Sequence, residues 1–205
     1  MEATTLLITL PLILFLSFPT NGVSARHGFS IVDQPPAVLD ASGRELLEGK
    51  YYYLRPALRL PPFGTTAIIP GVYRNETCWF HVGVERFPFS ITGLPAKFSP
   101  VAPGNESSIR ESTDVIIEFS DKLALVCGGS SVLKATRFLS LGGSGDRNSW
   151  FKIEKLPEPR HAYKLVYRSR RVVGTSTRPD NTERLALTDE PLPFEFRPIL
   201  NHPSA

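Results

Sequence analysis

The chain has 205 residues, with 23 Lys and Arg against 20 Asp and Glu, so its formal net charge is only +3. A charge this small, spread along the chain, gives no electrostatic footprint for a nucleic acid. After residue 25, no apolar run reaches the roughly 20 residues that a membrane-spanning helix needs, so no membrane partner is expected.

The first predicted element is a secretory signal peptide over residues 1–25. Its apolar run, TLLITLPLILFLSFPT, is too short for a membrane span of roughly 20 residues, and Val23, Ser24 and Ala25 offer small residues to signal peptidase. The segment is atypical because it has Glu2 and no Lys or Arg, and a buried helix or strand pair is the alternative. Its removal leaves one predicted domain over residues 26–205, with net charge +4 because Glu2 is the only charged residue lost.

The mature chain has two cysteines, Cys78 and Cys127, and two N-x-S/T sequons, at Asn75 and Asn105. In an oxidising compartment the cysteines are predicted to form one disulfide, which would stabilise the fold by roughly 4 kcal/mol; two buried thiols are the alternative. Both sequons lie in polar, turn-rich surroundings, so both asparagines are predicted to be glycosylated.

The mature chain is predicted to be all-β, a sandwich or a barrel. Its 19 Pro and 15 Gly are scattered and leave only short apolar segments. No stretch of ten or more residues keeps a period of 3.6, whereas Phe151/Ile153 and Phe194/Phe196 alternate with a period of two. We predict strands over residues 50–55, 67–70, 78–84, 89–91, 115–119, 124–127, 151–154, 163–167, 184–187 and 193–196.

A weak internal repeat accompanies these strands. Pairs of segments ending in an aromatic or branched residue recur at a spacing of roughly 40–60 residues, which would suit a closed barrel with three-fold symmetry. The three pairs are 51–54 with 79–84, 115–119 with 123–127, and 151–153 with 165–167.

Residues 38–54, VLDASGRELLEGKYYYL, resemble the N-terminal signature of the plant Kunitz (soybean trypsin inhibitor) family. NETCWFHV is similar to the family's first half-cystine segment, and GLPAKFSP with IRESTDVIIEF is similar to its miraculin-like branch. NSWFKIEK, AYKLVYR and RLALTDEPLPFEF match the C-terminal strands in order and spacing. The resemblance covers nearly all of residues 37–197 and implies a β-trefoil, a three-fold barrel of short antiparallel strands capped by hairpins.

Within this signature, residues 40–43 are predicted to form a tight turn in which Gly43 takes a positive φ. Tyr51 and Tyr53 share one face of the following strand, and Tyr52 takes the other. One of these faces is expected to enter the core with its hydroxyl near a hydrogen-bond partner. This stretch specifies the fold and not an activity.

The resemblance implies a protease inhibitor that presents a rigid, substrate-like loop to the protease cleft. The equivalent loop here is residues 99–108, SPVAPGNESS, which two prolines stiffen. The candidate contact residues are Ser99, Pro100, Val101, Ala102, Pro103, Gly104 and Asn105.

The loop departs from the trypsin-directed pattern in three ways. It has no Lys or Arg for the specificity pocket, where Val101, Ala102 and Asn105 are the available residues. Glu48 occupies the place of an Asn that commonly braces the loop carbonyls, and an ionised carboxylate cannot donate. A glycan on Asn105 would obstruct docking. The expected target is therefore a serine protease that prefers small or apolar residues, or a papain-like cysteine protease.

The remaining motifs give weaker evidence about function. Residues 167–173, YRSRRVV, lack the family's second disulfide, and their arginines form either a solvated hairpin or a basic contact site. The stretch GGSGD at residues 142–146 has Asp146 where a nucleophile elbow needs Gly. The four histidines are unpaired at ligand spacing. No catalysis, metal or cofactor is predicted. The histidines are His27, His81, His161 and His202.

Two functions follow from these readings. The first is a secreted, monomeric protease inhibitor, located in the apoplast or the vacuole. The second is a non-inhibitory storage, defence or small-ligand protein on the same scaffold, because GDRNSWFKIEK is similar to a segment of the water-soluble chlorophyll proteins.

Overall fold

The structure is a computed structural model that describes residues 34–57, 65–73, 76–85, 93–102, 104, 107–120, 130–168, 170–179 and 181–199. The described residues from Pro35 onward belong to one unit. The predicted signal peptide lies outside the described residues. None of the described residues belongs to a helix long and apolar enough to cross a membrane.

The described chain forms short strands and one turn of 3-10 helix, η1 at Arg147–Ser149. The strands are β1 (Tyr51–Pro56), β2 (Thr65–Tyr73), β3 (Glu76–Glu85), β4 (Pro95–Pro100), β5 (Asp114–Phe119), β6 (Leu133–Ala135), β7 (Leu139–Leu141), β8 (Trp150–Lys155), β9 (Tyr163–Tyr167), β10 (Arg171–Thr177), β11 (Glu183–Thr188) and β12 (Phe194–Pro198).

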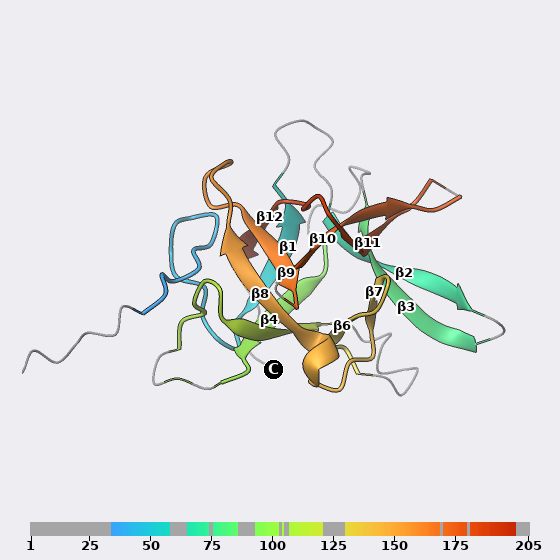
Figure 1. Cartoon of the computed structure of the whole chain (residues 1–205), viewed down its shortest axis with the longest axis horizontal. Coiled ribbons are helices and arrows are strands. Elements are labelled where there is room, and N and C mark those ends of the chain that lie inside the picture. The colour runs from blue at the N-terminus through green and yellow to red at the C-terminus, as the bar shows by residue number, and fades with distance from the viewer. Residues whose placement is uncertain are drawn as a thin grey trace, which may run out of the picture. The chain divides into compact units, whose positions relative to one another are not determined.

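Six strands close into a barrel. Antiparallel pairing runs from β12 through β1, β4, β5 and β8 to β9, and the bridge between Phe194 and Tyr163 returns from β9 to β12. The other strands form the hairpins β2–β3, β6–β7 and β10–β11, which pair with one another through β3. Figure 1 shows the barrel strands gathered on one side and these hairpins on the other. Three successive units of four strands make this a β-trefoil, as predicted.

The core repeats the three-fold arrangement residue by residue. Phe98 lies opposite Ile117, Ile153 opposite Leu165, and Phe196 opposite Leu54, one such pair at each of three equivalent strand pairs. All six side chains are fully buried. Burial of each contributes about 1.5–3 kcal/mol, so the barrel interior is the main source of stability.

The predicted strands agree with those of the structure wherever the chain is described. Residues 163–167 coincide with β9, while the predictions at 89–91 and 124–127 lie outside the described residues. Four strands of the structure, β4, β6, β7 and β10, were not predicted. The prolines of β4 hid it but stand only at its ends, where strands tolerate them; β6 and β7 are too short for a period, and β10 begins in the arginine run.

The predicted repeat had the right number of units but a wrong boundary. Its third pair, 151–153 with 165–167, joins β8 to β9. In the structure β8 ends the second unit and β9 begins the third. The boundary was misplaced because β8 and β9, which belong to different units, pair with each other as closely as strands of one unit do.

Candidate binding loop between β4 and β5

The N-terminal arm of the predicted loop is held by the sheet. Ser99 and Pro100 lie opposite Ile116 and Val115, so the first two predicted loop residues belong to β4, a correction to the boundary. The Val101 N–H then donates to the carbonyl of Asp114 at 2.9 Å. The arm is therefore fixed as far as residue 101.

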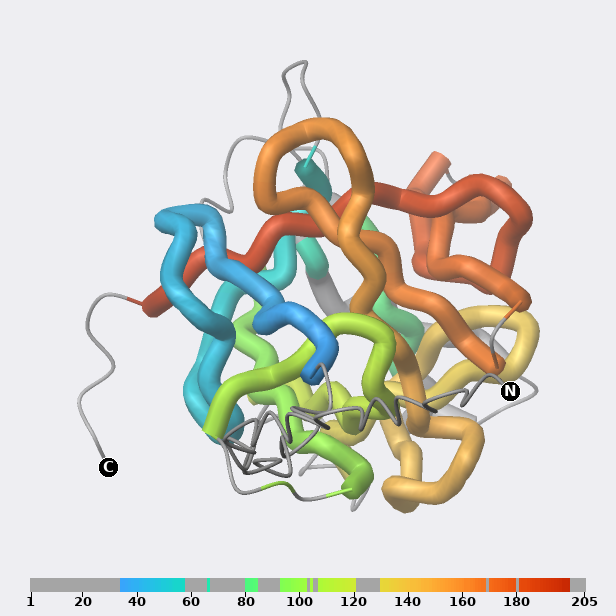
Figure 2. Tube along the Cα trace, turned by 60° about the vertical axis from the view of Figure 1, so that its left-hand side comes forward, coloured from blue at the N-terminus to red at the C-terminus, as the bar shows by residue number. Residues whose placement is uncertain are grey.

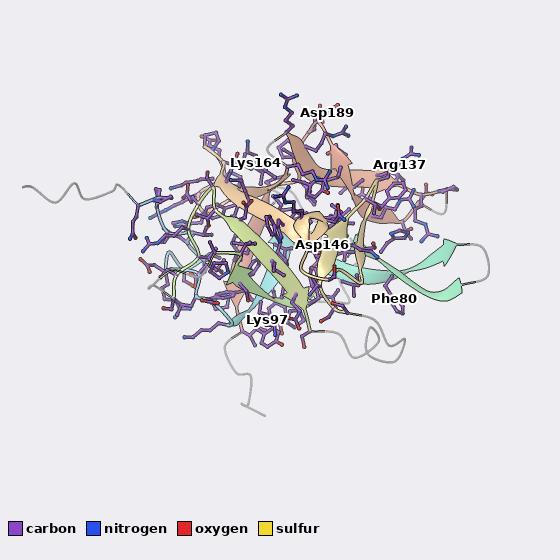
Figure 3. All side chains as sticks on the ribbon, turned by 60° about the horizontal axis from the view of Figure 1, so that its bottom comes forward. Phe80, Lys97, Arg137, Asp146, Lys164 and Asp189 are labelled. Atoms are coloured by element: carbon purple, nitrogen blue, oxygen red, sulfur yellow. The ribbon has the colours of Figure 1, made fainter. Side chains whose placement is uncertain are left out.

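The exposed part of the loop begins at Ala102. Ala102, Gly104 and Ser107 are exposed, whereas Val101 is half-buried. Two of the predicted contact residues, Pro103 and Asn105, lie outside the described residues. The exposed stretch contains no Lys or Arg. The closest basic side chain on β4 is Lys97, which Figure 3 labels, and its Nζ lies 3.0 Å from the Glu118 carboxylate.

The C-terminal arm returns into the core at Ile109, which is fully buried. Its N–H donates to the carbonyl of Leu46 at 2.8 Å, and its carbonyl accepts from the N–H of Val38 at 2.9 Å. An isolated bridge joins Leu47 to Ser108. Figure 2 shows the opening segment, in blue, beside the yellow-green chain that leads towards β5. The loop thus leaves the barrel beside one buried apolar residue, Phe98, and re-enters at another.

The predicted turn at residues 40–43 orders the opening segment. Gly43 has a φ of +80°, and its N–H donates to the Asp40 carbonyl. The Asp40 carboxylate is 2% exposed and accepts hydrogen bonds from the N–H groups of Ser42, at 2.7 Å, and Arg44, at 3.1 Å. The turn prediction is confirmed, and an Asx-type bond to the backbone stabilises it.

Tyr52 connects the opening segment to the core, which decides between the two faces that the alternation of the three tyrosines left open. Its side chain is 4% exposed, and its hydroxyl accepts a hydrogen bond from the Leu47 N–H at 3.0 Å. Its ring lies 6.4 Å from that of Phe98, and Phe98 meets Phe196 edge to face at 5.2 Å. The buried aromatic cluster beneath the loop therefore also holds the segment that contacts the loop.

Residues 45–49 contact both arms of the loop. The Glu48 N–H donates to the Ser107 carbonyl at 2.6 Å, and the next N–H, of Gly49, donates to the Phe98 carbonyl at 3.1 Å. The Ser108 hydroxyl donates to the Glu45 carboxylate. Sequence reasoning placed Glu48 correctly but considered only its side chain, whereas the donor is its backbone. It missed Glu45 and Gly49, although an isolated Gly before a strand was a signal for the latter.

Burial shifts the pKa of two titratable groups at the base of the loop. Burial raises the pKa of Glu111, and the opposing attraction of Lys155 does not cancel it. Burial also raises the pKa of Tyr163, whose hydroxyl accepts a hydrogen bond from the Leu39 N–H at 2.8 Å. Both groups lie where the opening segment crosses the barrel end, so this end is tightly packed against the segment.

The basic turn after β9 is tied to the body of the protein. Arg168 donates to the Asn148 side chain at 2.9 Å and lies over the Tyr167 ring, 5.1 Å from its centroid. Arg171 donates to the Leu187 carbonyl at 2.9 Å. Two of the three arginines therefore have structural partners, while Arg170 is exposed.

The stretch that resembles the water-soluble chlorophyll proteins, residues 145–155, also has a structural role. The Asp146 carboxylate accepts the Asn148 N–H at 2.8 Å and caps η1, and the Trp150 indole donates to the Gly145 carbonyl at 2.8 Å. Cys78 lies on β3, but its side chain, Cys127 and the sequon at Asn75 lie outside the described residues. The predicted disulfide and glycans remain predictions.

Comparisons with known proteins agree with this fold. A family profile described as "Trypsin and protease inhibitor", the legume Kunitz family, matches residues 38–197. The chain is 32% identical over 175 residues to Kunitz trypsin inhibitor 5 of Arabidopsis thaliana, covering 78% of this chain and 84% of that one. It is 30% identical over 195 residues to miraculin of Synsepalum dulcificum, covering 79% and 83%.

Solved structures give the same architecture. A rice (Oryza sativa) bifunctional alpha-amylase/subtilisin inhibitor matches with a TM-score of 0.67 and 30% identity, covering 80% of this chain and 99% of that one. A water-soluble chlorophyll protein from Brassica oleracea var. botrytis matches with a TM-score of 0.68 and 26% identity, covering 80% and 98%. The chain belongs to the plant Kunitz family of protease inhibitors, in its miraculin-like branch, and it is not an enzyme.

Proposed function

We propose that the protein inhibits a protease by inserting residues 101–107 into the protease cleft. The observation that carries this proposal is the pair of adjacent amides, Glu48 and Gly49, that hold the two arms of the loop. A loop that is ordered before binding loses little entropy in the complex, so its contacts translate into affinity. The general class of partner, a protease, is inferred from the inhibitors of the same family.

The target is a serine protease that accepts small or apolar residues, and a papain-like cysteine protease is the alternative. The sequence of the loop offers Val101, Ala102 and Asn105 and no basic residue. One relative that is 30% identical over 145 residues is a subtilisin inhibitor from Canavalia lineata. A potato cysteine protease inhibitor shares the fold with a TM-score of 0.63 and 25% identity.

The same proposal includes the location, the processing and the covalent modifications of the protein. The protein is secreted after removal of residues 1–25, acts as a monomer over residues 26–205, and resides in the apoplast or vacuole. Cys78 and Cys127 form its disulfide, and Asn75 and Asn105 accept glycans. Mass spectrometry of the purified protein tests these points. The N-terminal residue reports removal of residues 1–25, the mass change on reduction reports the disulfide, and the mass lost on deglycosylation reports the glycans.

A panel of proteases tests the function directly. The deglycosylated protein is mixed with subtilisin, an elastase, trypsin and papain, and the residual activity of each is measured. We expect inhibition of subtilisin or elastase, or of papain, and little effect on trypsin. Silence across all four contradicts the proposal.

An arginine scan tests whether the loop is the contact and which residue enters the pocket. The variants are Val101→Arg, Ala102→Arg, Gly104→Arg and Asn105→Arg. We expect one of them to inhibit trypsin, because trypsin selects for a basic side chain there. Arg160→Ala, in the exposed connection between β8 and β9, is the control and should leave inhibition unchanged.

Pigment binding is a second candidate because of the likeness to the chlorophyll protein. The structural roles of Asp146 and Trp150 account for the similar stretch without a ligand. Mixing the protein with chlorophyll and recording the visible spectrum after gel filtration tests this candidate. A protein that elutes colourless contradicts it.

A further inference from the structure

We infer that Gly49 is a positioning residue for the inhibitory loop. Its left-handed backbone conformation lets residues 45–49 hold both arms of the loop at once. This inference rests on the proposed function for its effect on inhibition, but its effect on the loop can be measured without a protease target.

Successive amides at Glu48 and Gly49 point to carbonyls that lie nine residues apart in the chain. Glu48 donates to Ser107 on the C-terminal arm, and Gly49 donates to Phe98 at the start of the N-terminal arm. Gly49 has a φ of +70°. In a regular strand, successive N–H groups point to opposite sides, so a chain that hydrogen-bonds on both sides must lie between the two arms. Residues 48–49 are therefore the link through which the position of one arm determines that of the other.

The rest of the segment keeps this link in place. The Glu45 carboxylate accepts a hydrogen bond from Ser108, one residue after Ser107. The Leu47 N–H donates to the buried Tyr52 hydroxyl. A side-chain bond on one side and a core tyrosine on the other thus hold the residues that precede Gly49. Only Lys50 separates Gly49 from β1 (Tyr51–Pro56), so the strand limits how far Gly49 can shift along the chain.

The space around Gly49 separates a backbone effect from a steric one. A Cβ atom built at Gly49 has no atom within 4 Å beyond Gly49 itself and its two chain neighbours. Gly49→Ala therefore causes no clash, and it acts only by disfavouring the positive φ. We expect the substitution to raise the population of loops with a released arm about tenfold, because an L-residue is strained in the left-handed region. Asn tolerates this region better, so Gly49→Asn should restore part of the loss.

Gly142 provides a matched control. It also has a positive φ, +100°, and the atoms closest to a Cβ there belong to the flexible end of Lys134, at 3.4 Å. It follows β7, and the described chain has no hydrogen bond between Gly142 and residues 45–49 or 98–108. Gly142→Ala should cost comparable stability while leaving the loop unchanged.

The experiment measures loop opening and inhibition separately. The purified wild-type protein, Gly49→Ala, Gly49→Asn and Gly142→Ala are exposed to thermolysin under native conditions, and cuts within residues 101–107 are followed by mass spectrometry. Inhibition constants for the protease found in the panel, and midpoints of thermal unfolding, are measured on the same samples. We expect loop cleavage and the inhibition constant to rise about tenfold in Gly49→Ala, less in Gly49→Asn, and not in Gly142→Ala.

Each result decides one point. Equal loop cleavage in Gly49→Ala and the wild type, or an equal rise in Gly142→Ala, overturns the positioning role. If the wild type inhibits no protease while Gly49→Ala still exposes the loop to thermolysin, the positioning role stands and the proposed function fails. If loop cleavage rises but the inhibition constant does not, the link between loop order and inhibition is wrong.

Discussion

The two connections between successive units of the trefoil are built differently. The connection from β8 to β9 closes on itself: Leu156 donates to the Ala162 carbonyl at 2.9 Å, and Ala162 donates to the Pro159 carbonyl at 3.0 Å. The connection from β4 to β5, residues 101–113, relies on a segment outside it, since residues 38–49 contact both of its arms. The three-fold pairing places both connections at equivalent points of the barrel, but it does not determine their conformations.

The difference shows what the opening segment contributes. Without it, the C-terminal arm of the β4–β5 connection would lose the bonds that Leu46 and Glu48 make to it. A self-closed turn is stable but cannot present an extended chain. An externally braced connection can be both extended and ordered, and this is the form that a protease cleft accepts. Substitutions in the core, in the opening segment and in the two connections can break this contrast or sharpen it.

Phe98→Ala and Ile153→Ala compare equivalent core positions below the two connections. Both side chains are fully buried, so Phe98→Ala should lower the free energy of unfolding by about 3–5 kcal/mol and Ile153→Ala by about 2–5 kcal/mol. Only Phe98 contacts Tyr52 and carries the carbonyl that Gly49 binds. Chemical denaturation gives the stabilities. Loop cleavage measured at equal folded fractions should be faster in Phe98→Ala; equal rates in the two variants contradict the contrast.

Asp40→Ala tests the opening segment directly. The buried carboxylate accepts two backbone N–H groups, and its removal should cost about 1–3 kcal/mol of unfolding free energy. Hydrogen exchange should then rise at Ile109, which is bonded to this segment, and stay unchanged at Ala162 in the self-closed connection. A uniform rise at both amides shows that the two connections are equally dependent on the segment.

Ser108→Ala removes the hydrogen bond to Glu45 without altering the backbone. Because the bond is exposed, we expect a stability loss of at most about 1 kcal/mol and a rise of about two- to fivefold in the inhibition constant. Thr113→Ala is the control, since the Thr113 hydroxyl bonds to Arg110 within the same connection but away from the arms. A larger rise in Thr113→Ala than in Ser108→Ala would place the effect elsewhere.

Glu111→Gln tests an acidic group of the β4–β5 connection that lies near Lys155, at the end of β8. Burial raises the pKa of Glu111 above its ordinary value of 4.5, so the folded protein keeps this proton to a higher pH than the unfolded chain. The contribution of this group to stability is therefore lost as pH rises from about 4.5 through the folded pKa. Unfolding midpoints measured from pH 4 to pH 7 should fall less steeply in Glu111→Gln; an unchanged slope is the contrary result.

The features that were predicted from sequence are those that depend on residues close together in the chain. The strand at residues 163–167, the turn of Asp40 and Gly43, and the inward face of Tyr52 depend on alternation and turn chemistry within a few residues. The bonds from Glu48 and Gly49 could not be predicted in this way, because they join residues 59 and 49 positions apart in the chain through backbone N–H and C=O groups that almost every residue has. Strand β4 could not be predicted because its prolines, Pro95 and Pro100, stand at its two ends, and sequence alone does not show where a strand ends.

The adjacent donors at Glu48 and Gly49 have a consequence for a chain whose loop has been cut. A scission between residues 102 and 106 would create two new ends, yet Phe98 and Ser107 would still be bound to neighbouring residues of the same segment. The ends would stay close together at a high effective concentration, which favours re-forming the peptide bond over separation. The protein can therefore be attacked by a protease and still remain one folded body.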